Sequence, residues 1–325
     1  MNWGQHCLRA RQPAVDSVGR GGPVVPPIVR AISAHPSLGG YTLSIPGRAQ
    51  DMAATGDLDI TDDLTLTGAG AASTIIDGGA LDRVVHTDPA GTGVAVTIDG
   101  VTIQNGSSIV IAFVLSDGGG IRNGSSNTAI ANAGGTLTIT NSVVQNNVTE
   151  RAGGGVANAG TLVVVDTTVN GNTSGSNGGG LFQDDTGTTS LTRCTVSGNQ
   201  ASQGGGFFTG AFSTSADPTV TIVDTTISGN MAPNTGGIFY NRGTFTVRNT
   251  TISGNTDEGV HAGDTEGTLR NCTVAGNGSY GIDGPLELGN TIVAGNNGGA
   301  SGFDCNGTIT SDGHNLIQTT NNCVI

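Results

Sequence analysis

Acid–base chemistry in this chain of 325 residues would have to come from its 25 aspartates and glutamates and its five histidines. The strongest candidates are the run Gln183-Asp184-Asp185 and the stretch 259–263, which contains His261. Neighbours in sequence point to opposite faces of a strand, so Asp184 and Asp185 would not act together there. All twelve basic residues are arginine, which excludes a catalytic lysine. Whether an aspartate can meet His261 depends on the elements that carry them.

A second set of carboxylates, Asp57, Asp59, Asp62 and Asp63, lies in the sequence GDLDITDD. These residues alternate with apolar ones, as on a strand with one solvent-facing side. A Ca²⁺ site needs six or more converging oxygen ligands, and neighbouring strands offer few. The chain also lacks the Cys-x-x-Cys motif that is typical of a structural zinc site. We therefore interpret the four aspartates as an outward polar face and expect no metal ion and no cofactor.

Two sequence markers alternate along most of the chain. The hexapeptide TTISGN occupies residues 225–230 and returns at 250–255. Related hexamers end at Gly106, Asn147, Asn172, Asn199, Asn230, Asn255, Asn277 and Asn296. Between them, clusters of glycine followed by an apolar residue occur at 118–121, 153–156, 178–181, 204–207 and 236–238. Markers in fixed alternation indicate one supersecondary unit that repeats as a solenoid.

The repeating unit has the pattern of short strands. Apolar residues alternate with polar ones, as in Phe245-Thr246-Val247, and β-branched residues dominate. Three short strands joined by Gly and Asn corners need about 22 residues, the length of one coil of a parallel β-helix. We therefore predict an all-β parallel β-helix of about nine to ten coils, in which Val220, Ile222 and Ile227 point inward. Its bounds are 40–300, after an irregular leader (1–39) and before a closing unit (301–325).

Stacked coils place equivalent residues in one column, with ~4.8 Å between successive members of the column. One column follows the second strand of each unit and is predicted to form a ladder of short polar side chains, interrupted by Arg193. Its members are Asn141, Asp166, Asp224, Asn249, Asn271 and Asn290. Cys194 and Cys272 share an inward column but lie roughly 14 Å apart, beyond the reach of a disulfide. We expect both to be buried free thiols.

The residue after the inward apolar one forms another column, which contains Phe182, Phe208, Phe239 and His261. Facing outward, these rings would form an apolar strip suited to sugar rings or to a partner chain. The alternative is that a loop covers them, for example residues 211–219 with Phe212. By the same count Asp184 and His261 are three coils apart, roughly 14 Å. Paired carboxylates in glycosidases lie about 5–10 Å apart, so no catalytic residue is predicted.

The recurring Gly-Gly-Gly and T-[IV]-S-G-N motifs resemble those of right-handed parallel β-helix repeat proteins of bacterial surfaces and secretions. The similarity is to members with a CSLREA-type N-terminal region and a choice-of-anchor-type C-terminus. It covers residues 56–85, 96–296 and 304–323. The start departs from that family, because only CLRA (7–10) is similar to its signature, and a mis-started or truncated N-terminus is one interpretation. The resemblance implies export, surface exposure and a Cys305–Cys323 disulfide, and it carries over no catalytic residue.

Net charge and the lengths of the apolar runs bear on the partners and the location of the protein. The net charge of −13 would repel phosphate backbones, so nucleic-acid partners are not expected. No apolar run approaches the length of a spanning helix. We expect a monomeric protein that is secreted or displayed on a bacterial surface, as a structural or adhesive rod that binds polysaccharide or surface glycan along a lateral face. The alternative is a polysaccharide lyase or glycoside hydrolase of the β-helix type. Whether the protein is an enzyme stays open, with a non-enzymatic role favoured.

Overall fold

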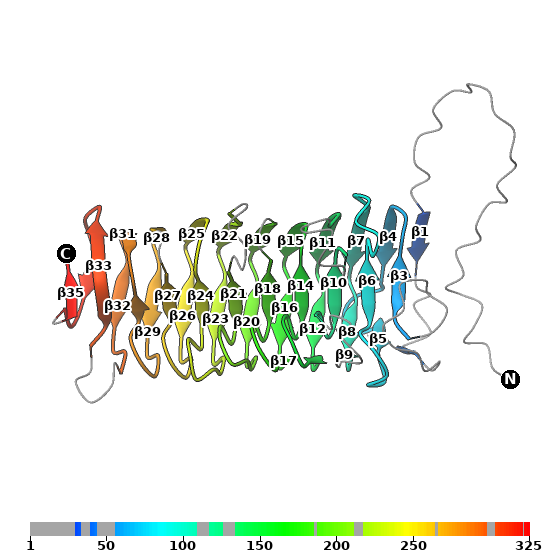
Figure 1. Cartoon of the computed structure of the whole chain (residues 1–325), viewed down its shortest axis with the longest axis horizontal. Helices are drawn as coiled ribbons and strands as arrows, with labels where there is room; N and C mark the ends of the chain where they lie inside the picture. Colours follow the sequence, from blue (N-terminus) through cyan, green and yellow to red (C-terminus); the bar gives the residue numbers. More distant parts are fainter. Residues whose placement is uncertain are drawn as a thin grey trace, which may run out of the picture.

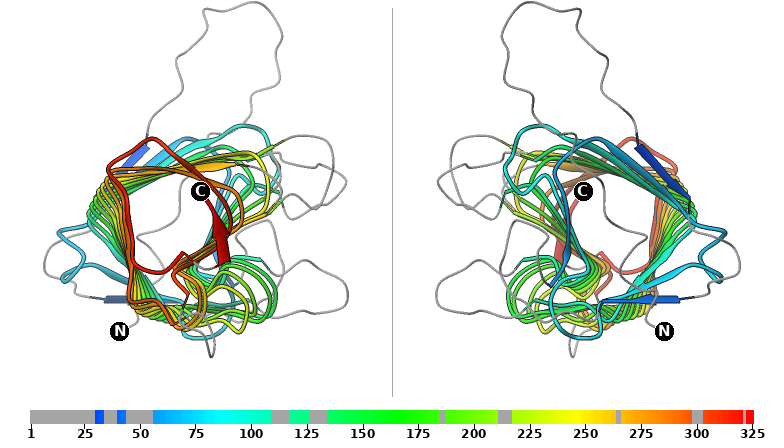
Figure 2. Two further views of the ribbon diagram at one scale, coloured as in Figure 1. Left: turned by 90° about the vertical axis from the view of Figure 1, so that its left-hand side faces the viewer. Right: turned by 90° about the vertical axis from the view of Figure 1, so that its right-hand side faces the viewer.

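The computed structural model describes residues 30–33, 40–43, 56–108, 117–125, 134–184, 187–210, 217–263, 266–297, 303–320 and 322–325. These residues wind into an elongated parallel β-helix, in which the strands of successive coils stack along the long axis (Figure 1). The first and last strands, β1 and β35, lie at opposite ends of the stack (Figure 1). Viewed along that axis, the strands superpose as walls around a common interior (Figure 2). The predicted fold class is therefore confirmed.

Three walls make up the solenoid, here called A, B and C. Wall A contains β1 (Arg30–Ser33), β4 (Leu64–Thr67), β7 (Ala95–Asp99), β11 (Thr136–Thr140), β15 (Thr161–Val165), β19 (Thr188–Thr192), β22 (Thr219–Val223), β25 (Thr244–Arg248), β28 (Gly267–Arg270) and β31 (Leu286–Gly289). Wall B contains β2 (Gly40–Thr42), β5 (Ile75–Asp77), β8 (Thr102–Gln104), β12 (Val143–Gln145), β16 (Thr168–Asn170), β20 (Thr195–Ser197), β23 (Thr226–Ser228), β26 (Thr251–Ser253), β29 (Thr273–Ala275), β32 (Ile292–Ala294) and β34 (Leu316–Ile317).

Wall C contains β3 (Leu58–Ile60), β6 (Val85–Thr87), β10 (Ile121–Asn123), β14 (Val156–Asn158), β18 (Leu181–Gln183), β21 (Phe207–Thr209), β24 (Ile238–Tyr240), β27 (Val260–Ala262), β30 (Ile282–Asp283), β33 (Cys305–Ser311) and β35 (Asn322–Val324). Strand β33 joins two walls, since its start pairs with β30 and its end with β31. The short strands β9 (Ser107–Ser108), β13 (Val148–Thr149) and β17 (Thr173–Ser174) form a small fourth stack at one corner.

The two copies of the hexapeptide lie in neighbouring coils. Strand β23 pairs in parallel with β26, which places Ile227 directly beside Ile252. Within the described ranges wall B has 11 strands, slightly more than the nine to ten coils expected from the repeats. Three of these strands, β2 and β5 at one end and β34 at the other, lack the hexamer motif. At the N-terminal end, strand β1 falls within residues 1–39 and pairs with β4.

The interior of the solenoid is one continuous cluster of mostly aliphatic side chains, which also contains Phe207, Tyr240 and Phe245. Val220, Ile222 and Ile227 are fully buried, as the alternation in the sequence predicts. Burial of each such side chain contributes roughly 1.5–3 kcal/mol relative to exposure. The predicted thiols also lie here, since Cys194 and Cys272 are both free and buried. A disulfide joins Cys305 to Cys323 in the last coils.

A ladder of buried asparagines runs along one corner, between wall B and the glycine clusters. Its members are the last residues of the hexamers: Asn147, Asn172, Asn199, Asn230, Asn255, Asn277 and Asn296. Each amide donates to the side-chain oxygen of the next one, as from Asn230 Nδ2 to Asn255 Oδ1 at 3.0 Å. At the C-terminal end the ladder closes on a carboxylate, where Asn296 donates to Asp304. The repeats in the sequence align on these asparagines, but the pattern alone predicted no role for them.

The six polar residues of the column after the second strand lie at the corner between walls A and B. All six have a positive φ of 49–55°, which Asn and Asp adopt more readily than most residues. Several are joined by hydrogen bonds from coil to coil, for example Asn249 Nδ2 to Asp224 Oδ1 at 2.9 Å. Arg193 was expected to interrupt this column. It instead donates from Nε to Asp166 Oδ1 at 2.7 Å and continues the contacts.

No segment within the described ranges forms a helix of the length and apolarity needed to cross a membrane.

Candidate functional site

The central residues of the strands in wall C form one outward column along the rod. In its middle the rings of Phe182, Phe208, Phe239 and His261 are stacked nearly parallel. The distances between ring centroids are 5.8, 4.8 and 4.8 Å in that order. In-register parallel pairing of β18, β21, β24 and β27 produces this spacing.

The four rings differ in exposure. Phe182 and Phe208 are only 4% and 3% exposed, and they pack with Ala152 and Ala157 in a cluster separate from the main core. The expectation of an exposed strip is therefore wrong for these two rings. Phe239 and His261 remain partly exposed. Residues 211–216 of the loop suggested as a cover, which include Phe212, are not among the described residues.

Beyond His261 the column becomes polar and hydrogen-bonded. His261 Nδ1 lies 3.1 Å from Asp283 Oδ2, and Asn306 Nδ2 donates to Asp283 Oδ1 at 2.6 Å. Asn322 Nδ2 then donates to Asn306 Oδ1 and to the hydroxyl of Tyr280, at 2.9 and 3.2 Å. An aromatic surface thus continues into a row of amide, carboxylate and hydroxyl groups along one face.

A second carboxylate, Glu258, lies close to this row. One side-chain ligand atom from each of Glu258, His261 and Asp283 lies within 4.8 Å of the other two. Burial raises the pKa of Glu258, and the neighbouring Asp257 raises it further. Burial would also raise the pKa of Asp283, but hydrogen bonds from His261 and Asn306 lower it below its ordinary value. Carboxylates with pKa values shifted in opposite directions are typical of acid–base pairs.

The His261–Asp283 pair gives the first testable prediction, a pH-dependent stability. The hydrogen bond to Asp283 raises the pKa of His261, although burial opposes the shift. A raised histidine pKa stabilises the fold fully below the unfolded value of about 6.5, and this contribution is lost as pH rises through the folded pKa. The lowered pKa of Asp283 stabilises the fold above about pH 3.9, and this contribution is lost as pH falls through the folded pKa of Asp283. The pair therefore contributes most between about pH 4 and 6.5.

The variant His261→Phe keeps a stacked ring but cannot titrate. We expect the melting temperature of the wild-type protein to exceed that of His261→Phe by more at pH 5.5 than at pH 8.5. Thermal melting followed by circular dichroism at both pH values measures this difference. A difference in melting temperature that is the same at both pH values would contradict the prediction.

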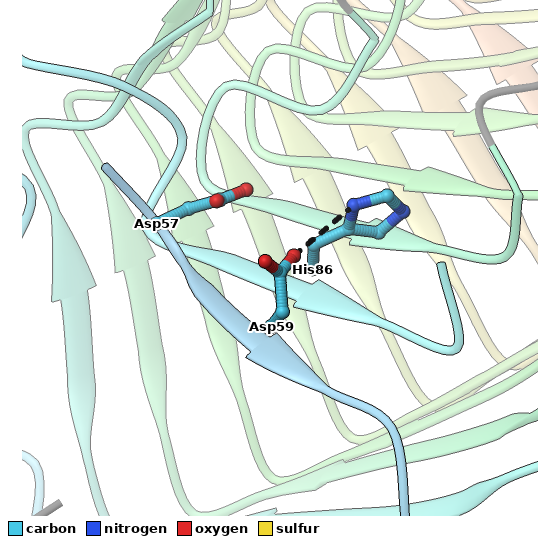
Figure 3. Close-up of side chains that lie close together, drawn as sticks. All are labelled: Asp57, Asp59 and His86. Carbon is cyan, nitrogen blue, oxygen red and sulfur yellow. Dashed lines mark ion pairs between the residues drawn. The ribbon is translucent and has the colours of Figure 1, made fainter. Parts of the chain in front are cut away.

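Near the N-terminal end of wall C, the same column holds a buried polar cluster. Strand register places Asp59 beside His86 and His86 beside Arg122. Figure 3 shows Asp57, Asp59 and His86 close together, and Asp59 Oδ1 lies 3.6 Å from His86 Nδ1. The side chains of Asp59 and His86 are 0% exposed and that of Asp57 is 2% exposed. Asp57 and Asp59 are therefore buried, and the expectation that they form a solvent-facing polar surface is wrong.

Charged neighbours surround this cluster. Arg83 Nε lies 2.9 Å from Asp57 Oδ2, and Arg83 also donates to the carbonyl oxygen of Asp117 at 3.2 Å. Burial raises the pKa of Asp57 to about 8, even though Arg83 opposes the shift. The sequence did not reveal the cluster, because the Gly-Gly-Gly marker begins only at residue 118 and the earlier coils could not be aligned on it.

The structure does not bring the other acidic candidates to His261. Asp184 follows β18, and His261 is on β27, three strands away along wall C, as the repeat count predicted. Asp185 lies outside the described residues. Asp62 is exposed, while Asp63 accepts a hydrogen bond from the backbone of Ala95 at 2.8 Å.

Comparisons with known proteins add little about function. No protein-family model matches the chain. No curated protein sequence matches it either. Among solved structures, the chain is similar to the A-module of a mannuronan C-5 epimerase from Azotobacter vinelandii, with 14% sequence identity and a TM-score of 0.44. This similarity covers 88% of the chain and 80% of the epimerase module.

Proposed function

We propose that the protein is an extracellular β-helical rod that binds glycan chains along the exposed end of the aromatic column. The observation that carries this proposal is the continuity of the partly exposed rings of Phe239 and His261 with the polar row at Asp283 and Asn306. Sugar rings present an apolar face that packs on aromatic rings, and hydroxyl groups that bond to carboxylates and amides. A site of this kind combines both types of contact on one lateral face.

The net charge of the protein bears on which glycans it would bind, and its disulfide bears on the compartment in which it would act. With a net charge of −13, the protein is expected to repel anionic polysaccharides, so we propose neutral glycans as ligands. The Cys305–Cys323 disulfide supports an oxidising environment such as the cell exterior. A surface or secreted location, inferred from the sequence resemblance, belongs to the same proposal.

Loss of the Phe239 ring tests glycan binding. We expect Phe239→Ala to weaken retention on insoluble neutral glycans about tenfold, as expected for loss of an aromatic contact of about 1–1.5 kcal/mol. Met231→Ala is the matched control, because Met231 is an apolar side chain that is 42% exposed elsewhere on the surface. Pull-down on a panel of insoluble glycans, with the melting temperature measured in parallel, checks the result. Equal retention of Phe239→Ala and wild type would refute the proposed site.

A second candidate function is glycoside hydrolysis at the same face. It is favoured by the opposite pKa shifts of Glu258 and Asp283 and by their separation, since their nearest ligand atoms are within 4.8 Å. Retaining glycosidases hold their two carboxyl groups about 5–5.5 Å apart. In this arrangement Glu258 would be the proton donor and Asp283 the ionised partner. A reducing-end assay on the bound glycan separates the two functions, because a binding protein releases no new ends.

A further inference from the structure

We propose that Asp57, Asp59 and His86 form a binding site for a divalent transition-metal ion such as Zn²⁺. One ligand atom from each residue lies within 4.8 Å of the other two, so that a small movement of the side chains would bring all three within reach of a single ion. Imidazole nitrogen and carboxylate oxygen are ligands that Zn²⁺ commonly takes, at about 2.0–2.2 Å. A Ca²⁺ ion would need at least about six oxygens, more than these residues supply.

The hydrogen bond of His86 identifies which of its nitrogens is available. His86 Nε2 lies 2.9 Å from the carbonyl oxygen of Gly124, which can only accept, so Nε2 carries the proton. In a neutral imidazole, Nδ1 then presents a lone pair toward Asp59 Oδ1 at 3.6 Å. Two acceptors facing each other in a buried site favour a cation between them. Histidines that bind metals commonly donate their other N–H to a backbone carbonyl, as His86 does.

The geometry distinguishes a metal ion from a shared proton. A direct N–H···O hydrogen bond normally spans about 2.7–3.2 Å, shorter than the 3.6 Å between His86 Nδ1 and Asp59 Oδ1. Two metal–ligand bonds of about 2.1 Å that meet at an obtuse angle span this distance.

Asp57 supplies the third ligand. Its Oδ2 is paired with Arg83 at 2.9 Å, whereas its Oδ1 is buried and has no hydrogen-bond partner. A buried carboxylate oxygen without a partner is costly, and coordination of a cation would satisfy it.

The position of the cluster indicates what the ion would do. Asp57 and Asp59 lie at the start of wall C, on and beside β3, while His86 is on β6 of the next coil. A coil at the end of a solenoid has a neighbour on one side only and needs capping. A metal ion here would fasten the first strand of wall C to the second.

The test measures Zn²⁺ binding by the full chain with calorimetry and elemental analysis, and measures the melting temperature with and without Zn²⁺. We expect one Zn²⁺ per chain and a higher melting temperature in its presence. Asp59→Asn and His86→Gln should each weaken binding about 100-fold. Asp62→Asn, at an exposed aspartate two positions after β3, and His261→Phe, in the other group of potential ligands, should bind Zn²⁺ as the wild type does.

Absence of Zn²⁺ binding by the wild-type chain would overturn the proposal. So would binding that survives Asp59→Asn but disappears in His261→Phe, because the ion would then lie at the other cluster. If Asp59→Asn or His86→Gln fails to fold, visible absorption of the Co²⁺-loaded His261→Phe variant, which lacks the imidazole of the other cluster, decides the matter. A spectrum of nitrogen and oxygen coordination supports the site, and the spectrum of hydrated Co²⁺ contradicts it.

Discussion

Asn230→Ala is expected to lower the free energy of unfolding by roughly 3–5 kcal/mol, since each buried polar group left without a partner costs about 1–3 kcal/mol. Asn230 Oδ1 accepts two hydrogen bonds from Asn199, one from its backbone N–H at 3.0 Å and one from its Nδ2 at 2.9 Å. Asn230 Nδ2 also donates to the carbonyl of Val196 at 3.0 Å. Removal of the amide leaves these groups buried and unpaired in the middle of the ladder.

The matched control is Asn249→Gly in the exposed ladder. Asn249 makes a similar amide contact from coil to coil, but solvent can replace its partners. Its φ of 49° is a conformation that glycine adopts without strain. We expect a loss below about 1 kcal/mol, because an exposed hydrogen bond exchanges with water. Urea denaturation of both variants gives the comparison, and equal losses would show that burial of the asparagine ladder is unimportant.

The second large effect is expected from Gly180→Ala, which should cost roughly 3 kcal/mol because overpacking in a dense interior typically costs 1–3 kcal/mol or more. A Cβ on Gly180 would lie 2.6 Å from the carbonyl oxygen of Gly206 in the next coil and 3.0 Å from Asn199 Nδ2. Both neighbours are held by the coil stacking, the first as backbone and the second as a member of the buried ladder. The substituted chain must therefore push two coils apart.

Gly229→Ala separates this steric cost from backbone strain. Gly229 has a φ of 62°, which disfavours alanine, but a Cβ there would have no atom within 4 Å. We expect a loss of about 1–2 kcal/mol from the left-handed conformation alone. Thermal melting of the two variants ranks the effects. A loss in Gly229→Ala as large as in Gly180→Ala would contradict close backbone approach as the reason for the glycine clusters.

Asn230→Ala and Gly180→Ala test the two sides of one contact, between the asparagine ladder and the glycine clusters. The asparagine that ends each hexamer lies against a glycine of the cluster, as Asn199 does against Gly180. The amide fits because the glycine has no Cβ, and it donates to a carbonyl of wall B, as Asn199 does to Val169 at 3.0 Å. This close fit explains why the two markers recur together, coil after coil.

The sequence alone determined the architecture and most of the interior. In a solenoid the neighbours of a residue are its own equivalents one coil away, so aligned repeats already predict the contacts. For this reason the pairing of Ile227 with Ile252, the buried Val220 and the free thiol of Cys194 could all be predicted. The same alignment correctly separated Asp184 from His261.

Only the tertiary structure decided which outward residues are buried and which polar groups meet. Phe182 and Phe208 are buried in a small cluster with Ala152 and Ala157, outside the main core, and the alignment of the repeats does not predict this burial. The cluster of Asp57, Asp59 and His86 forms in coils that lack the glycine marker. Repetition therefore encodes contacts between coils, whereas contacts made once, at an end or on an outer face, depend on the folded chain as a whole.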